Sequence, residues 1–152
     1  MTRVISNEQL LNRIAAAFPV MPVPPAASIV ADVAGDLERD DVRNAFAGKA
    51  WTELPFEVLR YHAEAMYLLL PEGWVYYAPA YMSAVIRDYV ESDMISSIFA
   101  TTLLLESDAL LPLLSPSQRA TVREFLDWLL VTDDDHPRRG HVEDVLRELQ
   151  AG

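Results

Sequence analysis

The stretch from Trp51 to Tyr89 constrains the fold more than any other part of the chain. It holds all six tyrosines and two of the three tryptophans, and prolines at 55, 71 and 79 punctuate it. Between residues 56 and 70 apolar side chains recur every three to four positions, which predicts an amphipathic helix. Proline suits the first turn of a helix and breaks its interior. We therefore expect one helix from Pro55 that ends before Pro71, and a second helix that begins at Pro79.

The residues between these two helices predict a short aromatic elbow. Trp74 and Tyr77 lie in about one helical turn between two prolines, and the residue before a proline is disfavoured in the helical conformation. We expect a helical hairpin in which Trp74 and Tyr77 turn towards the core and the second helix packs back on the first.

The rest of the chain also has a helical pattern, and no segment alternates with period two over a useful length. Capping boxes at Ser6–Gln9 and Ser115–Gln118 predict two helix starts. The nearly uncharged run 94–105 predicts a buried helix, whereas residues 19–40 read as an irregular proline-rich and acidic connection. The sequence thus predicts an all-α fold, with residues 1–152 in a single compact domain of six to seven helices around a proline-punctuated hairpin.

The charge of the chain limits its partners. The formal net charge is −11, and Arg87 is the only basic residue between Tyr61 and Gln118. Such a surface repels nucleic-acid phosphates and anionic lipid, and no run approaches the roughly 20 apolar residues that span a bilayer. We expect neither nucleic-acid nor membrane binding. Solubility is the ordinary explanation of the acidity, and the alternative is an acidic face for a basic protein partner.

Cysteine usage and the N-terminal region bear on the compartment. The chain has no cysteine, so neither a disulfide framework nor thiolate chemistry is available. The uncharged stretch 14–31 is a candidate secretion signal, but four prolines between residues 19 and 25 break its apolar part. We expect a cytoplasmic protein.

Motifs that carry chemistry are missing. His141 and Asp144 could touch one ion, but there is no HExxH motif and no cysteine pair. The acidic cluster 36–41 lacks the glycine of a calcium loop, and the five glycines form no phosphate-binding loop. We therefore expect no metal site, no cofactor and no catalytic residues.

The candidate binding residues come from the aromatic stretch, and they are Trp51, His62, Trp74, Tyr76, Tyr77 and Tyr81. Such rings more often fill a core than a site. His62 lies on the apolar half of its predicted helix, where a histidine is usually hydrogen-bonded to a carbonyl. The alternative is a general base or ligand in a pocket formed with tyrosines 61, 76, 77 and 81.

A longer pattern, G-K-x-W-x-x-L-P, then L-x-x-x-x-x-A-x-x-L-L, then Y-Y-x-P-A-Y-M, resembles an uncharacterised family of small bacterial α-helical proteins. It is carried here by Gly48, Lys49, Trp51, Leu54, Pro55, Leu59, Ala65, Leu68, Leu69, Tyr76, Tyr77, Pro79, Ala80, Tyr81 and Met82. The resemblance extends from the N-terminal Ala-Ala-Phe-Pro to near residue 126. It implies a bacterial, single-domain protein and supplies no catalytic residues.

These observations favour a non-enzymatic cytoplasmic domain that binds another protein, because tyrosine and tryptophan are common at interfaces. An inhibitor or immunity-type protein that masks a basic toxin is one concrete form of this hypothesis. The alternative is a small-ligand-binding protein or an enzyme with its pocket at His62 and the tyrosines.

Overall fold

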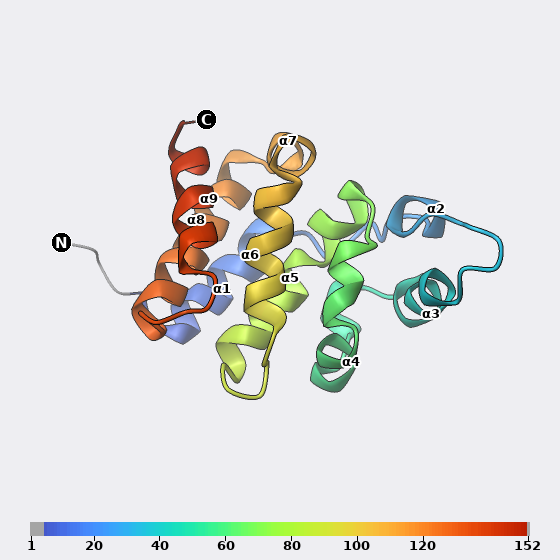
Figure 1. Ribbon diagram of the computed structural model, residues 1–152, viewed down its shortest axis with the longest axis horizontal. Coiled ribbons are helices and arrows are strands. Elements are labelled where there is room, and N and C mark those ends of the chain that lie inside the picture. Colours follow the sequence, from blue (N-terminus) through green and yellow to red (C-terminus); the bar gives the residue numbers. More distant parts are fainter. Residues whose placement is uncertain (1–4, 152) are drawn as a thin grey trace.

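The computed structural model describes residues 5–151, and within this range the chain is helical, without β-strands (Figure 1). The all-α prediction is confirmed. In chain order the elements are α1 (Asn7–Ala17), α2 (Ala26–Ile29), α3 (Leu37–Phe46), η1 (Trp51–Glu53), α4 (Phe56–Tyr61), η2 (Ala63–Tyr67), α5 (Pro71–Arg87), α6 (Ile95–Leu105), α7 (Ser107–Leu110), η3 (Leu111–Leu113), α8 (Pro116–Thr132) and α9 (Arg139–Ala151), where η denotes a 3-10 helix.

More helices are present among the described residues than the six to seven that we expected. The additional ones are short. α2 lies inside the segment 19–40, which is therefore not irregular throughout, and α7 lies in the leucine-rich segment between α6 and α8. α3 begins at Leu37, where the Asp36 carboxylate caps it by accepting the Arg39 N–H at 3.0 Å.

Local signals at the ends of α1 and α8 have the predicted geometry. The Ser6 hydroxyl accepts the Gln9 N–H at 3.1 Å, and the Gln9 side chain accepts the Ser6 N–H at 3.2 Å. The same reciprocal pair joins Ser115 and Gln118, at 3.1 and 2.9 Å. Both helices therefore start where their capping boxes predict.

The central hairpin differs from the prediction. α4 ends at Tyr61, with His62 as its C-terminal cap, and η2 follows, so the first helix does not run on to residue 70. Pro71 begins α5 instead of ending its predecessor, and α5 continues through Pro79 to Arg87. The prediction that Pro79 breaks the helix was wrong. An interior proline costs a helix about 3 kcal/mol, and the burial of nearly every α5 side chain around Pro79 outweighs that cost.

α5 is the central helix of the fold. Every residue from Tyr77 to Ile86 is buried, and the helix contacts α1, α2, α6 and α7. In Figure 1, α5 and α6 lie between α1, α8 and α9 at one end and α2, α3 and α4 at the other. The buried side chains of all these elements form one contiguous hydrophobic core.

Trp74 and Tyr77 both lie in this core, as expected, although on a continuous helix rather than at an elbow. Trp74 is 2% exposed, and its indole Nε1 donates to the Thr102 hydroxyl of α6 at 3.0 Å. Its ring packs against Phe99 with centroids 5.0 Å apart. The burial of Trp74 thus links α5 to α6.

The proline-rich segment between α1 and α2 is held by side chains from distant elements. The Trp51 indole donates to the Pro19 carbonyl at 3.3 Å, and the Tyr76 hydroxyl donates to the Val20 carbonyl at 2.6 Å. Gln118 of α8 donates to the Ala17 carbonyl at 3.3 Å. Because these backbone carbonyls have no helix partners, side-chain donors satisfy them.

Within residues 5–151, no single helix is long and apolar enough to cross a membrane. The bent pair Ile95–Leu105 and Ser107–Leu113 matches a span by length and composition, with an angle of 80° between its two parts.

Candidate functional site

The hydroxyls of Tyr76, Tyr77 and Tyr81 bind backbone groups, and these three tyrosines do not line a common pocket. The Tyr77 hydroxyl lies 2.7 Å from the Phe46 carbonyl oxygen and 2.8 Å from that of Lys49, and it donates its proton to them. The Tyr81 hydroxyl donates to the His62 carbonyl at 2.8 Å. Burial raises the pKa of Tyr77 and Tyr81 far above the usual value, so both are neutral donors.

Tyr76 and the two tryptophans are also engaged in packing. The Tyr76 hydroxyl accepts the Trp51 N–H at 3.1 Å while donating to Val20, and burial raises the pKa of this phenol as well. Trp51 is 8% exposed and Trp74 is buried in the core. Three of the six candidate binding residues nevertheless line pockets, each a different one: His62, Trp51 and Tyr76.

His62 is the C-terminal cap of α4, and its backbone is fixed by the Tyr81 hydroxyl. Its ring lies edge-on to Tyr61, with centroids 4.9 Å apart, and to Phe46 at 5.8 Å. Burial lowers the pKa of His62, and the nearby Asp41 carboxylate offsets part of this effect. The imidazole is therefore mainly neutral at pH 7.

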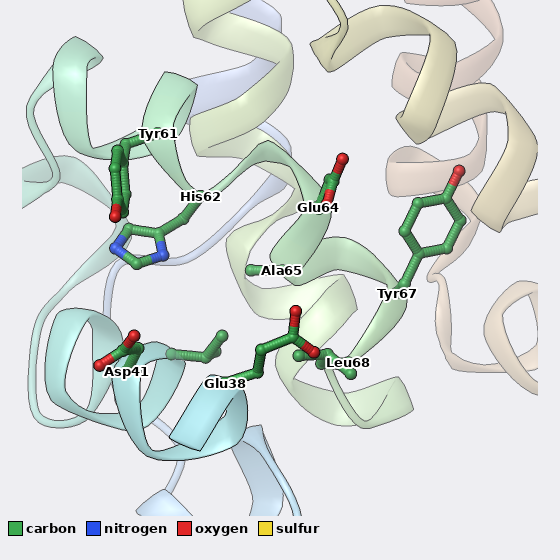
Figure 2. A pocket seen from close by; sticks show the side chains of 9 residues that line it. Glu38, Asp41, Tyr61, His62, Glu64, Ala65, Tyr67 and Leu68 are labelled. Carbon is green, nitrogen blue, oxygen red and sulfur yellow. The ribbon is translucent and has the colours of Figure 1, made fainter. Parts of the chain in front are cut away.

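A pocket of about 320 Å³ opens beside His62, between α3 and the α4–η2 segment (Figure 2). Figure 2 shows Glu38 and Asp41 on the α3 side, and His62 and Glu64 on the other. The pocket is lined by Glu38, Asp41, Val42, Tyr61, His62, Glu64, Ala65, Tyr67 and Leu68. Three carboxylates thus line it and no lysine or arginine does.

Two tyrosines at the pocket are unusually open to solvent. Tyr61 is 83% exposed and Tyr67 is 54% exposed. Of the four tyrosines predicted around His62, only Tyr61 lines the pocket, and Tyr67 joins it instead. Large exposed aromatic rings beside carboxylates form a surface suited to a cation, because the ring face is electron-rich.

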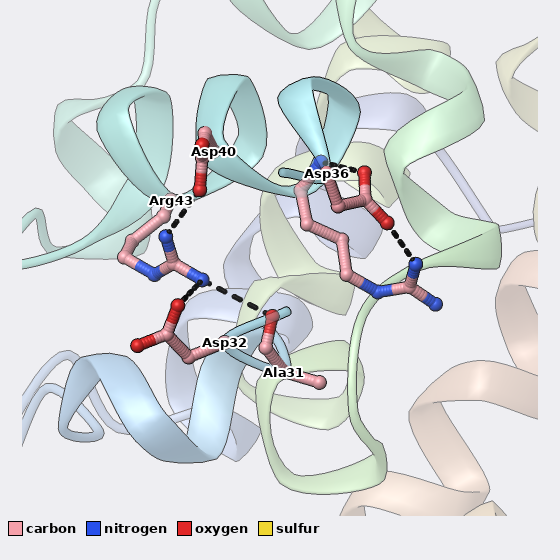
Figure 3. Close-up of polar contacts among 6 residues, drawn as sticks. Ala31, Asp32, Asp36, Asp40 and Arg43 are labelled. Atoms are coloured by element: carbon pink, nitrogen blue, oxygen red, sulfur yellow. Dashed lines mark hydrogen bonds and ion pairs between the residues drawn. The ribbon is translucent and has the colours of Figure 1, made fainter. Parts of the chain in front are cut away.

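The arginines of α3 pair with carboxylates other than Glu38 and Asp41, so these two remain available to the pocket (Figure 3). Arg43 pairs with Asp40 at 2.9 Å and with Asp32 at 3.5 Å, and Arg39 pairs with Asp36. Both arginines of α3 are therefore used by carboxylates on or before the helix. Among the described residues, neither Glu38 nor Asp41 forms an ion pair.

The acidic surface continues on the other side of Tyr61. A second, more open hollow of about 600 Å³ shares Tyr61 with the first and is lined by Phe56, Glu57, Arg60, Tyr61, Asp88, Glu91 and Asp93. Arg60 is its single cation, and Glu91 pairs with it at 3.4 Å. Tyr61 thus stands between two acidic hollows, and we call this surface the acidic face.

The acidic side chains do not form a metal site. Among residues 5–151, no group of three or more His, Asp or Glu side chains could hold a metal ion. The arrangement supplies dispersed negative charge and aromatic surface rather than converging ligands.

Comparison with known proteins gives the family. A family model covers residues 7–148, nearly the whole chain. The chain belongs to the family of unknown function DUF6714. No curated protein and no solved structure matches it. The family match extends beyond residue 126, where the resemblance seen in the sequence ended, and reaches into α9.

Apart from Tyr61 and His62, the sequence did not indicate the residues that line the pocket in this DUF6714 chain, including its other charged and aromatic ones, Glu38, Asp41, Glu64 and Tyr67. The cluster around Asp41 was noticed, but as a failed calcium loop. Nothing local indicates that α3 lies beside the α4–η2 segment, since that proximity depends on long-range packing. Tyr67 carried a weak signal, because it lies in the same aromatic stretch as His62.

Proposed function

We propose that this chain is a non-enzymatic protein-binding domain whose pocket beside His62 takes a lysine or arginine side chain of a basic partner protein. The observation that carries the proposal is the lining of that pocket. It combines three carboxylates with two exposed tyrosines and contains no cation.

The chemistry of the pocket fits a cationic side chain in two ways. A guanidinium or ammonium group can pair with Glu38, Asp41 or Glu64, and a charge-assisted hydrogen bond of this kind is stronger than a neutral one. The faces of Tyr61 and Tyr67 add cation–π attraction, worth about 0.5–1 kcal/mol at exposed sites. Neutral His62 adds no positive charge that would repel the guest.

The extent of the acidic face supports a protein rather than a small cation as the ligand. Four further carboxylates, Glu57, Asp88, Glu91 and Asp93, surround the second hollow beyond Tyr61. A basic segment of a partner can lie across Tyr61 and meet both hollows. Such a field also speeds the encounter of oppositely charged proteins.

The concrete form that we propose is a bacterial, cytoplasmic inhibitor or immunity-type protein that covers a basic surface of its target. The absence of cysteine, the net charge of −11 and the signature residues support this form. We also propose that the signature marks the family's fold. The first part of the signature, from Gly48, and its last part, from Tyr76, contact each other. The Tyr77 hydroxyl donates to the Lys49 carbonyl, and the Trp51 N–H donates to the Tyr76 hydroxyl.

The experiment compares two triple variants that remove the same amount of charge. Glu38→Gln/Asp41→Asn/Glu64→Gln neutralises the pocket, and Glu106→Gln/Asp135→Asn/Glu148→Gln neutralises three exposed carboxylates elsewhere. Binding of a short arginine- and lysine-rich peptide is measured by titration at low and moderate salt.

We expect the pocket variant to weaken peptide binding at least tenfold and the control variant by less than about threefold, since distant surface charges are screened. Tyr61→Ala should weaken binding without changing the net charge. Equal losses in both triple variants would mean that only net charge matters, and the proposed pocket would be wrong.

A further inference from the structure

A third pocket differs from the acidic face in chemistry. It has a volume of about 230 Å³ and lies between α1, η1, α4 and α5. Its lining includes Ala80, Ser83 and Ala84 of α5, apolar side chains such as Trp51 and Leu59, and the charged residue Arg87. No carboxylate lines it, although the chain as a whole has a net charge of −11.

Four of the lining residues come from one face of α5. Ala80, Ser83, Ala84 and Arg87 are spaced three, four and seven positions apart, so they lie along the same side of the helix. The first three are small and at most 6% exposed, and they leave the space that the pocket occupies. Arg87 is exposed at the C-terminal end of this row.

Ser83 is a buried polar residue without a partner. It is 6% exposed, and its hydroxyl makes no hydrogen bond among the described residues. The hydroxyl of Thr102, in contrast, donates to the Ile98 carbonyl at 2.9 Å. The Ser83 oxygen is not fully enclosed by protein atoms. It therefore remains accessible, and the pocket that Ser83 lines gives that access. Buried hydroxyls normally have a partner, which makes Ser83 a group open to a ligand.

Arg87 is also unpaired. It forms no ion pair among the described residues, whereas nearby Arg60 pairs with Glu91 at 3.4 Å. The carboxylate of the neighbouring Asp88 accepts the Glu91 N–H at 3.1 Å and forms no ion pair with Arg87. The guanidinium of Arg87 is therefore free to pair with an anion at the end of the pocket.

We propose that this pocket binds a carboxylate that carries an apolar body about the size of an aromatic ring. Arg87 pairs with the carboxylate, and the Ser83 hydroxyl, one helical turn away, donates a hydrogen bond to it. The apolar body lies on Ala80 and Ala84 beside Trp51. A cavity of roughly 150 Å³ holds one benzene molecule, so about 230 Å³ accommodates a ring with a short acid arm.

Two sources could supply this chemistry, a free arylalkanoic acid or the C-terminal phenylalanine of a peptide. The test uses 3-phenylpropionate for the first and a short peptide ending in phenylalanine for the second. The matched neutral probes are 3-phenylpropanamide and the same peptide with an amidated C-terminus. Binding is followed by NMR through the indole N–H of Trp51, which lies at the pocket and donates to Pro19.

We expect at least one of the two acids to shift the Trp51 indole resonance saturably, and its neutral counterpart to bind at least tenfold more weakly. Arg87→Gln and Ser83→Ala should each weaken acid binding severalfold, whereas Arg123→Gln on α8 should not. Ala84→Leu should abolish binding by filling the pocket. The acid that binds identifies the source.

Three results would overturn the proposal: neither acid shifts the resonance, the neutral probes bind as tightly as the acids, or Arg87→Gln leaves the affinity unchanged. Circular dichroism of each variant shows whether it is folded. None of these residues lines the pocket beside His62, so this test and the test of the proposed protein-binding function fail or succeed separately.

Discussion

The contact between α2 and α5 depends on the absence of a side chain at Gly73. A Cβ added there would lie 2.7 Å from the Ile29 Cα and 2.8 Å from the Ile29 carbonyl oxygen. Ordinary contacts begin at 3.4 Å, so the neighbouring backbone would have to move by several tenths of an ångström. Ile29 cannot move freely, because it is fully buried and its carbonyl accepts the Leu70 N–H at 2.8 Å.

The cost of Gly73→Ala can be worked from these contacts. Overpacking that shifts backbone costs about 1–3 kcal/mol, and weakening of the Leu70–Ile29 hydrogen bond adds about 1 kcal/mol. Alanine returns up to about 1 kcal/mol because it favours helix over glycine. We therefore expect a net loss of about 1–3 kcal/mol, which corresponds to a fall in Tm of roughly 2–12 °C for a domain of this size.

Gly140→Ala is the matched control. Gly140 is also helical, in α9, but an added Cβ there meets nothing within 4 Å. The same chemical change should then be neutral or stabilise by up to about 1 kcal/mol. Both variants are measured by urea unfolding and by thermal melts. A Gly73→Ala protein as stable as wild type, or more stable, would refute the steric reasoning.

Three further predictions concern buried groups. Trp74→Ala should cost roughly 3–5 kcal/mol of unfolding free energy, because the ring is buried; a denaturant midpoint that barely moves at constant m would contradict this. Tyr77→Phe should cost about 1–3 kcal/mol, because two backbone carbonyls lose their donor; an unchanged Tm would show that water replaces it. Acid should destabilise the fold as the pH falls below 6.5, because burial lowers the pKa of His136 and the unfolded chain takes up that proton first. The loss should grow until the pH reaches the folded-state pKa, and His136→Gln should flatten the slope of stability just below pH 6.5; an identical slope would rule His136 out.

The tautomer of His136 gives that last prediction its structural basis. Its Nδ1 accepts the Arg138 N–H at 3.0 Å, so the ring proton lies on Nε2, which donates to the Ser96 hydroxyl at 2.9 Å. A second proton on Nδ1 would replace an accepted hydrogen bond with two opposed donors. The neutral ring is therefore the form that the fold requires.

Features that depend on a few neighbouring residues were predictable from the sequence. The capping boxes at Ser6 and Ser115 are complete within four residues. Gly48, just after α3, has the left-handed φ of 76° that is typical of a glycine at a helix end. Helical periodicity was likewise sufficient for the all-α fold class. In each case local chemistry decides the outcome.

The course of the chain through Pro71 and Pro79 was not predictable by the same rules. Apart from Glu72 and Arg87, the segment 71–87 carries no charged residue, which is the pattern of a helix buried on every side. That pattern competed with a strong helix-breaking signal from Pro79, and sequence alone does not show how much packing energy opposes the proline. In the folded protein, tertiary packing outweighs the helix-breaking effect of Pro79.

The candidate site was likewise only partly predictable from the sequence. Tyr61 and His62 were found because they are adjacent in a conspicuous aromatic stretch, whereas Glu38 and Asp41 reach the pocket from α3. The third pocket depends on α1, η1, α4 and α5 meeting. Its sequence traces were Trp51, which was a candidate binding residue, and the isolation of Arg87 among acidic residues.

The central position of α5 has a consequence for amide hydrogen exchange. Its inner residues are covered by several other helices, so their amides can reach solvent only when the whole domain opens. The same helix supplies Tyr81, which holds the His62 carbonyl, and Ser83, which lines the third pocket. A ligand in either pocket binds only the closed form and should slow the exchange of these amides by a factor of 1 + [L]/Kd. The exchange of the α5 amides should thus report both a cationic ligand in the pocket beside His62 and an anionic ligand in the third pocket.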